Sequence, residues 1–235
     1  MKITLLTGRT FDIENAFDFP LKVNASFRLK RLNLRIDHKK RMVVLSMPKL
    51  CSKKKAFDFI NEHIDWIEEK LSQLPEIKEF EDGEAITLFG NQVTICHQRD
   101  FGAPKLIEHT LFVGGDKVFL HRRIKDYIKR EAKKIFYAKS KVLADNLGCK
   151  LTGVSIKDTK SRWGSCSTLK HINYNWRIAL APDFVIDYLM AHEVAHLKHQ
   201  DHSSAFWQTV ENLYPNTKAG KDWLSKHGNE LYLYK

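Results

Sequence analysis

The chain has 235 residues, of which 43% are hydrophobic and 29% charged, and these proportions are ordinary for a globular protein. They exclude a disordered or low-complexity chain and leave room for one large domain or two small ones. No apolar run approaches the ~20 residues needed to cross a bilayer, and the N-terminal apolar stretch is too short for a signal peptide. The cysteines are scattered and form no Cys-x-x-Cys pair, which favours a reducing, cytoplasmic location over a disulfide framework or a cysteine zinc site.

The net charge of +11 is distributed unevenly along the chain. Residues 22–55 hold twelve Lys and Arg against one acid, whereas residues 56–86 hold ten acids against two lysines. Residues 121–141 hold nine Lys and Arg against two acids, and residues 192–235 are neutral. A basic surface attracts nucleic acid or another polyanion, but clustered lysines are also common on solvated surfaces. Both interpretations stay open for the basic N-terminal half.

The first part of the chain is predicted to be β-rich with one helix. Partial alternation and a short apolar run predict two strands within residues 22–47, joined by a turn at residues 36–41. Pro48 ends the second strand. Ser52 is the expected N-cap of a helix that continues to about Gln73, and its apolar residues recur at spacings of three and four.

Two hairpins and a long helix are expected after an acidic connector at residues 75–83. Gly90-Asn91 predicts the turn of the first hairpin, and Gly114-Gly115-Asp116 predicts the turn of the second, between apolar triplets. Helical spacing then predicts a helix from about Arg122 to Leu147, ended by Gly148.

We expect an α+β protein in two parts, which is also compatible with one continuous domain. The first part, residues 1–120, is β-rich with one helix, and the second, residues 121–235, contains further strands and helices. Strands are predicted at residues 151–158 and 171–178, and Pro182 suits the first turn of the next helix.

The segment from His192 to His196 has the spacing H-E-x-x-H. On a helix, residues i and i+4 lie one above the other, so both imidazoles can bind one ion. Glu193 projects to the side, where it can contact a metal-bound water. Apolar residues such as Met190 and Val194 lie on the opposite side of the helical wheel and would bury the helix.

Three later residues could supply a third ligand: His199, His202 and Glu211. If the helix continued, His199 would lie about 10.5 Å along the axis from His192, too far for one ion to be shared easily. His202 follows the expected helix end at Gln200-Asp201, so it can return to the ion from another direction. We therefore favour His202 over both alternatives.

Four motifs between Lys160 and Trp207 occur together: SRWGSCS at 161–167, NYNWRIALAP at 173–182, HEVAH at 192–196, and His202-Ser203 followed by Phe206-Trp207. In these motifs the chain resembles the YgjP-like metallopeptidase family, which is related to SprT-like proteins and Spartan-type proteases. The basic strands and the helix containing Asp65-Trp66-Ile67 are also similar, so the resemblance covers most of the chain from about residue 22. It implies a zincin-like part whose HExxH helix packs on a small mixed sheet, a bound zinc ion, and metal-dependent hydrolase or peptidase activity.

We therefore expect a zinc-dependent peptidase in which His192, His196 and His202 bind Zn²⁺. Zinc on three protein ligands lowers the pKa of its water and polarises the scissile carbonyl of a peptide or protein substrate. Glu193 is expected to take the proton of the water and pass it to the leaving amine.

Two other classes of function stay open. The basic N-terminal half could target the protease to DNA- or RNA-bound proteins, or the metal could only stabilise a non-catalytic module. Glu193 argues against the second, because a structural site needs no general base. The oxyanion stabiliser is open among Tyr188, His171 and Tyr214, and Cys166 is disfavoured as a nucleophile because the metal supplies one.

A substrate peptide can bind a zincin-like site by pairing its backbone with an edge strand above the metal helix. Residues 171–178, immediately before the Pro182 helix, are the best candidate for this edge strand. The sequence leaves open whether this strand is that edge or an ordinary internal strand.

Overall fold

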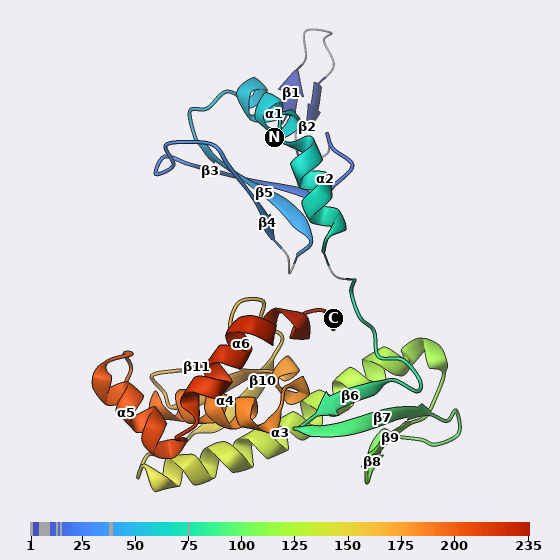
Figure 1. Ribbon diagram of the computed structural model, residues 1–235, viewed down its shortest axis with the longest axis vertical. Helices are drawn as coiled ribbons and strands as arrows, with labels where there is room; N and C mark the ends of the chain where they lie inside the picture. The colour runs from blue at the N-terminus through green and yellow to red at the C-terminus, as the bar shows by residue number, and fades with distance from the viewer. Residues whose placement is uncertain (1, 5–9, 13, 15, 38–39, 75) are drawn as a thin grey trace. The chain divides into compact units, whose positions relative to one another are not determined.

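The computed structural model in Figure 1 describes residues 2–4, 10–12, 14, 16–37, 40–74 and 76–235. Part of the N-terminal apolar stretch, the turn residues His38 and Lys39, and Pro75 of the acidic connector lie outside these residues. The chain forms two compact units, residues 1–76 (unit 1) and residues 77–235 (unit 2). In the described part of the chain, no helix combines the length and the apolar character that a membrane crossing needs.

Unit 1 contains two short β-structures and a helix pair. Its strands are β1 (Lys2–Thr4), β2 (Thr10–Asp12), β3 (Leu21–Ser26), β4 (Asn33–Asp37) and β5 (Met42–Pro48). β1 pairs with β2, while β5 lies between β3 and β4, parallel to the first and antiparallel to the second. The predicted strands on either side of the turn at residues 36–41 are thus present as the β4–β5 hairpin.

The helical segment of unit 1 is two helices, α1 (Lys53–Asn61) and α2 (Ile64–Ser72). The Ser52 side chain accepts a hydrogen bond from the Lys55 backbone N–H, which confirms the predicted N-cap. The expectation of one continuous helix is wrong, because the backbone leaves the helical conformation at His63 (φ −115°, ψ 15°). Both helices contribute to one core with the sheet, in which Leu45, Ile60 and Ile67 are fully buried.

Unit 2 begins with a four-stranded sheet of order β6-β7-β9-β8. Its strands are β6 (Ala85–Leu88), β7 (Asn91–His97), β8 (Lys105–Ile107) and β9 (Thr110–Val113). The first predicted hairpin is present, with its turn at Phe89-Gly90, one residue earlier than expected. The second predicted hairpin is wrong, because its turn lies at Glu108-His109 and the segment after Gly115 coils into the 3-10 helix η2 (Lys117–Phe119). The Asp116 side chain caps the N-terminus of this 3-10 helix by accepting a hydrogen bond from the Val118 N–H.

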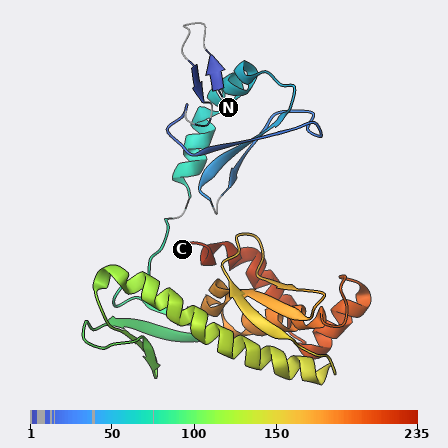
Figure 2. The same ribbon diagram turned by 180° about the vertical axis from the view of Figure 1, so that it is seen from behind.

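The long helix α3 (Leu120–Asn146) runs the length of unit 2, with the β6–β9 sheet at one end and a second sheet at the other (Figure 2). Its buried side includes Ile124, Ile128 and Phe136, which share one core with both sheets. This common core explains why the chain divides after Glu76 and not near residue 120, the boundary expected from the sequence.

The second sheet has the order β10-β12-β11, formed by β10 (Gly153–Lys157), β11 (Gly164–Cys166) and β12 (His171–Asn175). β12 pairs in parallel with β10 and antiparallel with β11, so it is the internal strand and has no free edge. It ends earlier than expected because the Asn175 side chain caps the 3-10 helix η3 (Trp176–Leu180). β11 is therefore an edge strand of this sheet.

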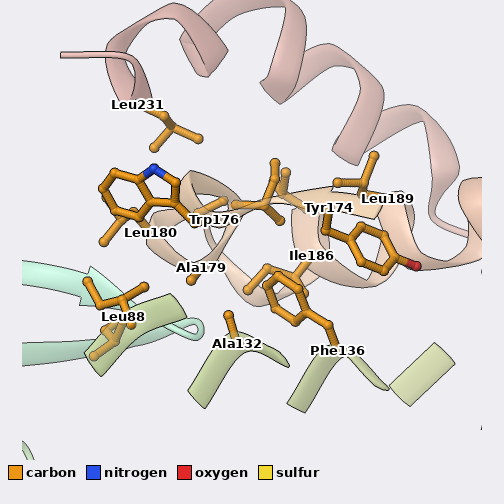
Figure 3. Packing of buried hydrophobic residues seen from close by; sticks show 14 of the residues in the cluster. Leu88, Ala132, Phe136, Tyr174, Trp176, Ala179, Leu180, Ile186, Leu189 and Leu231 are labelled. Carbon is orange, nitrogen blue, oxygen red and sulfur yellow. The ribbon is translucent and has the colours of Figure 1, made fainter. Parts of the chain in front are cut away.

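The C-terminal helices are α4 (Asp183–Ala195), α5 (Ser204–Leu213) and α6 (Thr217–Leu231). α4 contacts β11, α3, α5 and α6, which explains why most of its residues are buried. Figure 3 shows Phe136 of α3 beside Ile186 of α4 and Tyr174 of β12. The Phe136 and Tyr174 ring centroids are 5.5 Å apart in an edge-to-face arrangement. This packing fixes α4, and with it the H-E-x-x-H segment.

Candidate metal centre

The last turn of α4 and the loop that follows it bring three histidines together. His192 lies on α4 and His196 is its C-cap, so the predicted helical i, i+4 placement is present. After His196 the chain turns, with the His199 N–H donating to the Ala195 carbonyl, and returns with His202 just before α5. The Ser203 side chain then caps α5, which fixes the direction in which the loop re-enters.

The nitrogen atoms of His192, His196 and His202 that face one another all lie within 4.8 Å. The Nε2 atoms of His192 and His202 are 3.4 Å apart, and the ring centroids of His196 and His202 are 4.8 Å apart. Two rings thus come from one helix and the third from a loop on another side. This is the arrangement that the sequence predicted with His202 as the third residue.

The other two residues considered as third ligands do not join this group. His199 lies behind His196: its carbonyl accepts a hydrogen bond from His196 Nδ1 at 2.9 Å, and its own Nε2 lies 3.1 Å from Thr209 Oγ1. Because a carbonyl can only accept, Nδ1 of His196 carries the proton and its Nε2 keeps a free lone pair. Glu211 is exposed on α5 and is not part of the group.

The surroundings of His192 and His196 favour their neutral forms by lowering the pKa of each imidazole. Burial lowers the pKa of His192 to about 4, and the charges of His196, His202 and Lys221 act in the same direction. Burial also lowers the pKa of His196, against the opposing effect of its hydrogen bond to His199. Neutral imidazoles have the lone pairs that a metal requires, so these rings are ready to bind a cation near neutral pH.

Glu193, which follows His192 on α4, is buried against the edge strand β11. A β-carbon built on Gly164 would lie only 2.5 Å from Glu193 Cδ, so the carboxyl group occupies the space that a side chain at Gly164 would fill. Glu193 Oε2 is buried and has no hydrogen-bond partner among the described residues. Burial raises the pKa of Glu193 to about 8, although the positive charge of Arg162 opposes the shift.

Comparison with protein families shows which family the chain belongs to. The profile described as "YgjP-like, metallopeptidase domain" matches residues 30–227, which is most of the chain. The chain belongs to the YgjP-like family. A similar solved structure is the crystal structure of the metallopeptidase zymogen of Pyrococcus abyssi abylysin, which is 27% identical over 38% of this chain and 91% of that chain, with a TM-score of 0.35. No curated protein matches the chain. Family membership supports a metal-dependent peptidase.

Aromatic side chains surround the histidines of this YgjP-like domain. Phe206 of α5 is fully buried, and its ring centroid lies 5.0 Å from that of His192, 4.5 Å from His196 and 4.8 Å from His202. Trp207 lies 5.6 Å from the His192 ring. Phe206-Trp207 is part of a motif in the sequence, but the motif does not predict that Phe206 packs against all three rings. That contact depends on how α5 packs against α4.

The residues proposed as oxyanion stabilisers do not lie together. Tyr188 is buried one turn before His192, and the two ring centroids are 6.0 Å apart. His171 lies on the sheet, where its Nε2 is 2.8 Å from Ser155 Oγ. Tyr214 lines a pocket of about 480 Å³ with Lys139 and Asp187 on another side of α4. Of the three, Tyr188 is the one that the structure places beside the histidines.

Cys166 lies on β11 and is half-buried. Burial raises the pKa of its thiol to about 11, and the charge of Glu193 acts in the same direction. A thiol of that pKa stays protonated near neutral pH and is a poor nucleophile. This supports the expectation that Cys166 is not the attacking group.

Proposed function

We propose that this YgjP-like protein is a zinc-dependent peptidase with a zincin-like catalytic part, held in the cell's cytoplasm. The observation that carries the proposal is the convergence of His192, His196 and His202, together with the buried Glu193 at the next position of the same helix. Three protein ligands and a nearby carboxyl group are typical of catalytic zinc sites, which keep one position open. A purely structural site would need no such carboxyl group.

The donor set fits zinc. Imidazole nitrogen suits zinc among the common divalent metals, whereas calcium and magnesium prefer sites made of oxygen. The hydrogen bond from His196 Nδ1 to the His199 carbonyl orients the ring, as partners of metal-binding histidines commonly do. The unpartnered Oε2 of Glu193 indicates that a polar group is missing from its surroundings.

In this proposal, Glu193 is the general base and acid. When bound, zinc supplies a positive charge that polarises a peptide carbonyl, acidifies water and favours the carboxylate form of Glu193. The Glu193 carboxylate accepts the proton of the attacking water and then donates it to the leaving amine. Gly164 has no side chain and so leaves the space that this carboxyl group occupies. The buried Phe206 ring packs against the three imidazoles and shields them from water on the side that it covers.

Metal analysis and a peptidase assay on purified variants test this proposal. Glu193→Gln should keep one zinc per chain and lose hydrolysis by at least about a hundredfold, because only the proton acceptor is removed. His202→Ala should lose zinc and activity together. His199→Ala is the matched control, since it removes a histidine from the same loop but should retain zinc. Normal turnover by Glu193→Gln would contradict the proposal.

A further inference from the structure

The two basic segments of the chain differ in how their charges are compensated. In the segment at residues 121–141, which lies on α3, most cations have a carboxylate partner. The pairs are Lys125 with Asp158, Arg130 and Lys134 with Glu131, Lys139 with Asp183 and Asp187, and Lys141 with Asp145. Five of the nine cations of that segment are therefore paired with carboxylates of unit 2.

The basic segment of unit 1 is not compensated in this way. The following cations are exposed and form no salt bridge with any residue that the structure describes: Lys22, Arg28, Lys30, Arg31, Arg35, Lys49, Lys54 and Lys55. The one acid of the segment, Asp37, is at the far end of β4 and accepts a hydrogen bond from the Lys40 N–H. An exposed group of unpaired cations creates a positive potential that attracts an anionic partner.

Four of these cations gather where β3 and β5 end. The two strands run parallel and stop side by side at Ser26 and Pro48. The Lys49 N–H donates to the Ser26 carbonyl at 3.2 Å, so the segments that follow the two strands are joined. We call this region the basic end of the sheet; it consists of Phe27, Arg28, Lys30, Arg31, Lys49 and Leu50.

The basic end also exposes large apolar side chains. Phe27 is 71% exposed and Leu50 is 89% exposed, and neither belongs to the core of unit 1. The Lys49 Nζ atom lies 4.6 Å from the Phe27 ring centroid, which places a cation directly beside an exposed aromatic face. A cation next to an exposed ring can hold a phosphate while the ring stacks on a base.

The sheet surface next to the basic end is polar. The register places Lys22 and Arg35 on either side of Val44, and Asn24 and Asn33 on either side of Ser46. These side chains can donate hydrogen bonds to phosphates and bases. A surface that binds membranes usually has a wider apolar patch than this row of amides and cations provides.

We propose that the basic end of the sheet in unit 1 binds single-stranded nucleic acid, with Arg28, Lys30, Arg31 and Lys49 on phosphates and Phe27 stacked on a base. A single strand is favoured over a duplex because a base must be unstacked to reach the Phe27 ring. The site is independent of the metal centre, so it can be tested apart from the peptidase activity.

Fluorescence anisotropy of the full-length protein with labelled 20-nucleotide strands, oligo-dT and oligo-U, tests the proposal. Binding at 50 mM salt should weaken steeply as salt is raised. The variant Arg28→Ala/Lys30→Ala/Arg31→Ala should bind at least about tenfold more weakly. Its log–log salt slope should be shallower by about 2, since each phosphate contact on a single strand contributes ~0.7. Phe27→Ala should weaken binding about fivefold or more and leave the slope unchanged.

Matched variants in unit 2 are the controls. Lys105→Ala/Lys133→Ala/Lys150→Ala removes the same charge from exposed positions, and Phe119→Ala removes another exposed ring; both should bind like the wild type. Absence of binding at 20 mM salt would overturn the proposal, and so would equal losses in the two triple variants. Binding to phosphatidylserine-containing vesicles but not to either strand would also overturn it and assign the surface to membranes.

Discussion

At the scale of single residues, Gly164 sets the position of the Glu193 carboxyl group. A β-carbon at Gly164 would lie 2.5 Å from Glu193 Cδ, which is closer than two carbon atoms without a bond between them can approach. We predict that Gly164→Ala displaces the carboxyl group and lowers kcat by about a hundredfold, since small misplacements of a catalytic group have effects of that size. Zinc content, measured by atomic absorption, should not change.

Cys166→Ser is the control for that variant. It changes another residue of β11 by one atom, and Cys166 is half-buried with a protonated thiol. We expect it to retain zinc and most of the activity. Full activity in Gly164→Ala would show that Glu193 can move without consequence, and complete loss in Cys166→Ser would require a role for the thiol.

The clustering of His192, His196 and His202 could be predicted because the information for it is local. The i, i+4 spacing of His192 and His196 needs only a helix, and the choice of His202 needs only the place where that helix ends. Gly164 and Phe206 could not be predicted in the same way. Their roles depend on which strand lies at the sheet edge and on how α5 packs, and both are set by contacts between distant parts of the chain.

At the scale of elements, a buried arginine ties the end of β10 to the C-terminus. Arg177 is 5% exposed, donates to Asp158 Oδ1 at 2.5 Å and donates to the Tyr234 carbonyl at 2.7 Å. We predict that Asp158→Asn lowers the free energy of unfolding at pH 7 by about 1–2 kcal/mol, measured by urea titration, because it leaves a buried cation without its carboxylate. In the control Asp145→Asn, which breaks an exposed pair with Lys141, the change should stay below about 0.5 kcal/mol.

The same pair predicts a pH dependence. Burial opposes the charged form of Asp158, but the hydrogen bond and charge of Arg177, with help from Lys125, lower its pKa below the ordinary 3.8. A carboxyl group whose pKa is lowered by folding stabilises the folded state at pH values above its pKa in the unfolded chain. This contribution is lost as the pH falls through its pKa in the folded protein. The difference between wild type and Asp158→Asn should therefore be constant above about pH 5 and shrink below pH 4. A difference that grew on acidification would contradict this account.

The strand next to the metal helix also has a testable role. β12 is paired on both sides, so its backbone cannot accept a substrate, whereas β11 is an edge strand whose Gly164 touches Glu193. We predict that a peptide-like inhibitor protects amides of residues 164–166 from hydrogen exchange and leaves β12 unchanged. Protection confined to β12 while the inhibitor occupies the zinc site would contradict the assignment of β11.

Elements with one strong local signal could be predicted. Elements for which the same residues favour two different structures could not. Gly90 of the Gly90-Asn91 signal lies in the hairpin turn, which Phe89 and Gly90 form, and the spacing over residues 122–147 gives one long helix. Gly114-Gly115-Asp116 has an equally good turn signal. There, however, Asp116 caps a 3-10 helix that leads into α3, and the hairpin closes earlier, at Glu108-His109. Local propensity alone does not decide between those outcomes.

At the scale of the whole molecule, the boundary between the units could not be found from composition. Residues 85–113 are as β-rich as unit 1, which suggested a boundary near residue 120. Their apolar residues, among them Ile86, Val93 and Leu111, instead share a core with α3 and α4. Membership of a core depends on which elements pack together, and the sequence of each strand does not contain that information.

Separate cores predict separate unfolding, because each unit buries its own apolar residues. We expect two thermal transitions in the full-length protein, of which only the transition of unit 2 responds to zinc. In the proposed function zinc binds the folded site and not the unfolded chain, so at a hundred times its Kd it should add about 2.7 kcal/mol to the stability of unit 2. For a unit of this size that should raise its Tm by about 5–10 °C.

Trp66 is the one tryptophan in unit 1, so fluorescence of Trp66→Phe follows unit 2 alone, while circular dichroism follows both. His202→Ala should keep two transitions and lose the zinc response. A single transition that moves as a whole with zinc would show that the units unfold together and would contradict the prediction.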